Sequence, residues 1–147
     1  MGVDPERLLA LADEMAERAA EEDAGRAALA ILAAHATLEA VVNELGAEAI
    51  GSFNYRARFL PKWHDLCERT IGRQLETASD LERIQALRDA IVGYRGDPER
   101  LDRRSTSPPP EPPGEIGAED ASWAVETARG VIAEFHRAAG RDAPGWL

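Results

Sequence analysis

Apolar residues recur at three- and four-residue intervals along most of this chain, and glycine or proline separates one such stretch from the next. In the clearest stretch Ile84, Leu87, Ile91 and Tyr94 fall on one face of a helix. Alanine is abundant, and long runs of β-branched residues are almost absent. The pattern predicts an all-α fold.

The same spacing predicts helices in other parts of the chain: 4–22, about 25–46, a short one with Pro61 in its first turn, and about 119–139. Residues 47–59 contain several helix breakers and predict no regular element. Five prolines between residues 105 and 114 predict an extended connector. We therefore expect one domain, residues 1–147: an up-and-down bundle of four to five helices with a Pro-rich loop before the last one.

Local signals suggest where the helices begin and end. Ser79 with Glu82 three residues later has the spacing of a capping box, so we expect the central helix to start at Ser79. Gly46 is expected to end the second helix and Gly140 the last one.

The formal net charge of −10 argues against a large nucleic-acid surface, and no DNA partner is expected. Residues 83–104 nevertheless hold six arginines and four carboxylates, so this segment is locally basic. A small phosphate contact there is one interpretation. The other is that these are solvated charges on a helix and a loop.

A single cysteine, Cys67, excludes a disulfide within the chain and fits a reducing compartment. We find no apolar run near the roughly 20 residues that cross a bilayer, and the N-terminal MGVDPERLL lacks the basic and apolar parts of a signal peptide. The sequence therefore predicts a cytoplasmic protein without a membrane partner.

The histidines and the cysteine do not combine into a convincing metal or nucleophile site. His64 and Cys67 are three apart and would supply two ligands, whereas zinc needs about four donors, or three and a water. No third group orients them as a catalytic pair. His35 lies on the apolar stripe of the second helix, where a core histidine with a hydrogen-bond partner is expected. The sequence thus predicts no metal and no cofactor.

The segment LRDAIVGY, residues 87–94, resembles the signature helix of HEPN-domain proteins, commonly LRNALVHY. Arg88 and Asp89 match the first two motif positions, and Gly93 replaces the histidine. LEAVVNEL, FLPKWHDL and the C-terminal AVETARGVIAEFHRAAGRDAPGWL are similar to segments of the RiboL-PSP-HEPN-like branch. The resemblance spans roughly residues 25–147 and leaves the N-terminal helix outside it.

The resemblance implies a helical protein of bacterial stress, toxin-antitoxin or phage-defence systems. In the family, the arginine stabilises the scissile phosphate and the histidine transfers a proton. Glycine cannot do this, and the ordinary pKa of a tyrosine such as Tyr94, about 10, does not suit the task. We therefore expect a catalytically degenerate module with a homodimeric state, and RNA and a cognate antitoxin or defence-system protein as candidate partners.

Two alternatives stay open. In one, the chain is an active metal-independent ribonuclease in which Arg88 works with His64 or His35 brought across a dimer. In the other, it is a plain helical adaptor in which Arg88 only pairs with Glu39. The candidate site consists of Arg88 and Asp89 as catalytic residues, with Glu39, Asn43, Tyr94 and Arg95 as supporting polar groups.

Overall fold

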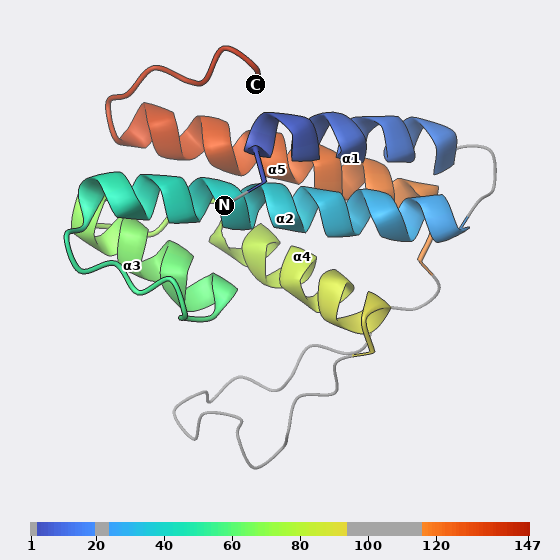
Figure 1. Ribbon diagram of the computed structural model, residues 1–147, viewed down its shortest axis with the longest axis horizontal. Coiled ribbons are helices and arrows are strands. Elements are labelled where there is room, and N and C mark those ends of the chain that lie inside the picture. The colour runs from blue at the N-terminus through green and yellow to red at the C-terminus, as the bar shows by residue number, and fades with distance from the viewer. Residues whose placement is uncertain (1–2, 20–23, 94–115) are drawn as a thin grey trace.

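A computed structural model describes residues 3–19, 24–93 and 116–147. These residues form five helices and no strand, which confirms the all-α prediction (Figure 1). The helices are α1 (Pro5–Ala19), α2 (Ala24–Ala49), α3 (Phe59–Ile71), α4 (Ala78–Ile91) and α5 (Ala118–Ala138). The Pro-rich segment 105–114 lies outside the described residues, as do Tyr94 and Arg95 of the candidate site.

Helix α2 is the longest helix and contacts each of the other four. Helices α1 and α5 pack against each other and against α2, while α3 and α4 cover another side of α2 (Figure 1). This central position explains the composition of α2. The predicted stripe is completely buried, and it comprises Ile31, His35, Leu38, Val42 and Leu45.

The core is built where α3 and α5 meet α2. Trp63 of α3 is fully buried, and its ring meets the ring of Phe135 of α5 edge-on at a centroid distance of 6.2 Å. Leu66 and Cys67 are buried beside Trp63, as their helical spacing predicts. Aromatic rings in this arrangement contribute about 1 kcal/mol beyond the area they bury.

The expectation that no segment is long and apolar enough for a membrane is wrong for α2. By length and composition alone, residues Gly25–Ala49 could cross a bilayer. In the bundle more than half of this stretch is buried by the other helices. A core helix surrounded on several sides has the same apolar composition as a membrane span, because both lack a solvent-facing polar half.

Gly46 does not end α2, contrary to the sequence prediction, and the helix continues to Ala49. The reason is packing against the loop that follows. A Cβ atom at residue 46 would lie 2.5 Å from the ring of Phe53, so only glycine allows this ring to pack on the helix. Phe53 and Ile50 are both buried and anchor the connection to α3.

The start of α4 also differs from the prediction. Ser79 lies inside the first turn, and the helix begins after Thr77. The carboxylate of Glu134, on α5, accepts hydrogen bonds from the amides of Glu76 (2.6 Å) and Thr77 (3.3 Å) and from the Thr77 hydroxyl (2.7 Å). A side chain from another helix thus binds the amide of the observed cap residue, Thr77, whereas the prediction had Glu82 binding the amide of Ser79.

A polar network across α2, α3 and α4 as the candidate site

His35 lies at the centre of a polar network on α2. Its ring is buried and packs against Phe59 of α3, with ring centroids 4.2 Å apart. Its Nε2 atom lies 2.8 Å from Oε1 of Gln85 on α4. Because the Gln85 amide nitrogen donates to Asp89, its oxygen faces the imidazole and His35 donates from Nε2. The predicted core histidine with a hydrogen-bond partner is confirmed.

The network continues along α4 to the predicted Arg88 and Asp89. Nε2 of Gln85 donates to Oδ1 of Asp89 at 2.8 Å, and an Arg88 guanidinium nitrogen donates to the same oxygen at 2.9 Å. Both ends of this ion pair are half-buried. Asp89 therefore balances the charge of Arg88 and links it to the buried imidazole.

A second branch joins α2 to α3. Lys62 is buried, and its ammonium donates to Oε1 of Glu39 at 2.8 Å and to Oδ1 of Asn43 at 2.9 Å. The other carboxylate oxygen of Glu39, Oε2, lies 4.0 Å from Nδ1 of His35. The predicted pair Glu39 and Asn43 thus shares a face of α2 and lies beside His35, which is hydrogen-bonded to the α4 branch that holds Arg88.

Burial keeps the imidazole of His35 neutral at neutral pH. Burial lowers the pKa of His35 below its ordinary value, and this outweighs the hydrogen bond that the ring donates to Gln85 and the charge of Glu39, which both raise the pKa. The positive charge of Arg88 lowers the pKa further, while Asp89 raises it. A neutral imidazole that already uses its Nε2 proton is poorly placed to transfer protons to an external substrate.

The structure therefore brings together four of the six predicted residues, namely Arg88, Asp89, Glu39 and Asn43. The predicted alternative in which Arg88 pairs with Glu39 is not what the geometry gives. The ion pair of Arg88 within the described chain is to Asp89.

Sequence reasoning missed Lys62 and Gln85, the residues that join the predicted ones. One signal was available for Lys62. It is the only lysine of the chain, and it stands next to Trp63 on the apolar side of a helix. Gln85 gave no such signal, because a glutamine at an ordinary helical position is usually solvated.

The backbone at Gly93 departs from a helix at the position where the resembled motif has its histidine. Helix α4 ends at Ile91, and Gly93 follows with φ at +68°. This left-handed conformation favours glycine. A side chain at residue 93 would therefore leave from the turn after the helix and not from the helix face that carries Arg88.

The remaining candidates for catalytic or metal chemistry do not form a site. Within residues 3–19, 24–93 and 116–147, no three His, Cys, Asp or Glu side chains gather as metal ligands. Burial raises the pKa of the Cys67 thiol to about 11, which leaves it protonated and unreactive at neutral pH. His64, its predicted companion, points from the exposed side of α3.

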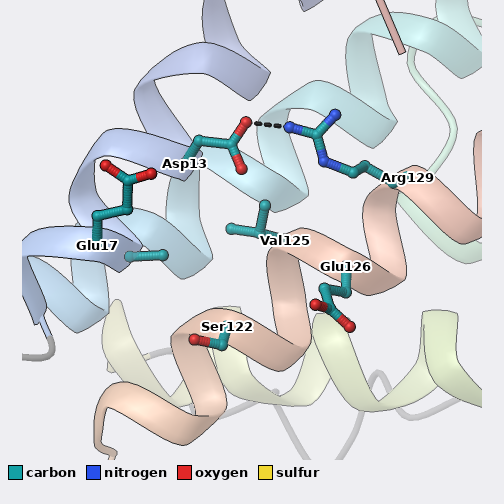
Figure 2. Close-up of a pocket in the computed structure, with 7 residues that line it drawn as sticks. Asp13, Glu17, Ser122, Val125, Glu126 and Arg129 are labelled. Carbon is teal, nitrogen blue, oxygen red and sulfur yellow. Dashed lines mark hydrogen bonds and ion pairs between the residues drawn. The ribbon is translucent and has the colours of Figure 1, made fainter.

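An open groove lies elsewhere, between α1 and α5 (Figure 2). Its volume is about 560 Å³, and Asp13 of α1 forms an ion pair across it with Arg129 of α5. Arg129 also donates to the carbonyl oxygen of Leu147 at 2.8 Å, which fixes the C-terminal segment. The sequence gave no indication of this groove, and it shares no residue with the polar network of α2, α3 and α4.

Comparison with known proteins adds no relative: no family model, no curated protein and no solved structure matches the chain.

Proposed function

We propose that this chain is a catalytically degenerate HEPN-like protein of a bacterial stress, toxin-antitoxin or phage-defence system, which acts as a dimeric interaction module. The observation that carries the proposal is the state of Arg88. It belongs to a network in which Asp89 balances its charge, and no proton-transferring group stands at residue 93. RNA is the alternative partner, through the half-exposed guanidinium.

The chemistry of the network supports a binding role over catalysis. Strand cleavage through a 2′-hydroxyl benefits from a group with a pKa near neutrality, and losing such a group costs roughly 10²- to 10⁴-fold in rate. His35 is the histidine nearest to Arg88 through hydrogen bonds, but it is buried and its Nε2 proton is held by Gln85. In the ribonuclease alternative, the candidate proton-transfer residue is therefore His64, which is exposed on α3.

The exposure of the network favours a site over a purely structural ion pair. The side chains of Arg88 and Glu39 remain 38% and 41% exposed. An ion pair that is this exposed contributes only about 0–1 kcal/mol to stability, so losing it costs the fold little. Arg88 can therefore contact a phosphate or a carboxylate of a partner by exchanging Asp89 for it.

A ribonuclease assay on total RNA and transfer RNA in EDTA tests this proposal. We expect the wild-type protein to leave RNA intact and light scattering to report a dimer. Gly93→His places an imidazole at the sequence position of the motif histidine, and Gly93→Asn is the matched control. Both variants place a side chain on a left-handed residue, which costs about 1–2 kcal/mol, but only the first adds a proton-transfer group.

The outcomes separate the three readings. Cleavage gained in Gly93→His but not in Gly93→Asn supports a HEPN-like site that lacks only its imidazole. Cleavage by the wild type that disappears in Arg88→Ala contradicts degeneracy and favours the ribonuclease. If no variant cleaves RNA and light scattering reports a monomer, the results favour the helical adaptor.

A further inference from the structure

His35 adds a polar contact between helices α2 and α4, which already pack through apolar side chains. Its Nε2 bond to Gln85 joins α2 to the middle of α4, and Phe59 of α3 covers the ring. The N-terminal end of α4 has its own attachment, the carboxylate of Glu134. The second half of α4, which carries Arg88, therefore depends on the imidazole for its polar contact with α2.

The charges that face His35 from each helix are already engaged. On α2, Glu39 is bound by the ammonium of Lys62 from α3. On α4, Asp89 is bound by Arg88 and by the Gln85 amide. A positive charge on the imidazole would thus lie near two carboxylates, each of which already neutralises another cation.

We propose that His35 is an acid-sensitive latch that holds the second half of α4 against α2, and that proton uptake at its Nδ1 atom releases this segment. Oε2 of Glu39, one turn further along the same helix, lies 4.0 Å from Nδ1. In the closed state the buried ring gives up the water that would solvate its charge, and this cost outweighs its bond to Gln85 and the attraction of Glu39, so the proton is taken up as the segment opens. Acid then changes how Arg88 is presented to a partner.

The direction of the pH effect follows from proton binding. Burial lowers the pKa of His35 in the closed state, so the open state binds a proton more readily. The closed state therefore loses stability as the pH falls below the free-histidine value of about 6.5, until it reaches the lowered pKa. When the imidazole stays neutral in the closed state, the equilibrium constant for opening of the second half of α4 rises by up to about 25-fold between pH 7 and pH 5.

Amide hydrogen exchange measured by NMR in the wild-type protein tests the latch. Opening constants are compared at pH 7 and pH 5 after correction for intrinsic exchange rates. We expect a rise of roughly 10- to 25-fold for the amides of residues 85–91, from the same proton linkage. Amides of α5 serve as the internal reference and should change little. An equal rise in both helices, or none in α4, overturns the proposal.

Three substitutions separate the imidazole from other causes. His35→Gln removes the titrating group, so the rise in α4 should vanish. Gln85→Glu places a carboxylate beside Nε2 and should reverse the trend, so that acid closes α4. His64→Gln is the matched control on an exposed histidine and should keep the wild-type response. If His35→Gln does not fold, the imidazole ¹⁵N shifts of the wild type decide: a ring that is protonated while α4 stays closed refutes the latch.

Discussion

The buried ammonium of Lys62 leads to an asymmetric prediction: removing its partner should destabilise the protein more than removing the lysine itself. The side chain of Lys62 is 2% exposed, whereas that of Glu39 is 41% exposed. Glu39→Ala leaves a buried positive charge with Asn43 as its remaining acceptor within the described network. Lys62→Met leaves a carboxylate that water can reach.

The structure sets the size of each effect. Breaking a buried ion pair costs about 3–5 kcal/mol when an uncompensated charge stays behind. We expect about 3 kcal/mol for Glu39→Ala, at the low end because Asn43 still accepts a hydrogen bond from Lys62. Methionine matches the length of lysine and avoids the cost of burying its charge, so Lys62→Met should cost only about 1 kcal/mol.

Urea unfolding at neutral pH measures the free energy of unfolding of each single variant. The double variant, Glu39→Ala with Lys62→Met, completes a double-mutant cycle. Once Lys62 is methionine, Glu39→Ala should cost less than about 0.5 kcal/mol, because no buried charge remains. Glu44→Ala, an exposed carboxylate on the same helix, controls for loss of a glutamate and gain of helix propensity. If Lys62→Met is as costly as Glu39→Ala, the ammonium is not the source of the asymmetry and the reasoning fails.

Two further predictions concern packing and acid stability. Gly46→Ala should lower the free energy of unfolding by about 1–3 kcal/mol because its Cβ would clash with the ring of Phe53. The same change at Gly130, where nothing lies within 4 Å, should raise the free energy of unfolding by roughly 0.5–1 kcal/mol. Equal effects of the two changes in thermal unfolding would contradict the clash with Phe53. Burial alone would raise the pKa of Glu134, but hydrogen bonds from Thr77 and the loop before α4 lower it overall. Its contribution is therefore present above the ordinary pKa and is lost as the pH falls through the lowered one, so Glu134→Gln should cost about 2 kcal/mol at pH 7 and clearly less at pH 3.

The sequence predicted the helices because burial in this bundle follows helical periodicity. Where each helix faces the core on one side, the apolar stripe identifies both the helix and its buried face, as in α3 and α5. The failure at Gly46 has a specific cause. Glycine usually interrupts a helix, and here the ring of Phe53, seven residues later, occupies the space that the missing side chain leaves.

The candidate site was predicted in part, because helical spacing shows which residues share a helix face and not which faces meet. The four-residue interval placed Glu39 and Asn43 together, and the neighbouring pair Arg88 and Asp89 came from the resemblance. Their connection depends on Lys62, from a different helix, and on a buried histidine between the branches. Such contacts require the three-dimensional packing of α2, α3 and α4.

Helix α4 shows why local sequence signals have limited power in this chain. Its local capping signal, Ser79 with Glu82, is not used at the helix start. The bonds that fix the helix come from Glu134 at one end and His35 in the middle, which lie 57 and 50 residues away from their partners Thr77 and Gln85. Both bonds involve titratable groups whose pKa is lowered in the folded protein. Titratable side chains on α2 and α5 thus add polar contacts to the apolar packing of α4, and we expect the binding of a partner to Arg88 to depend on pH.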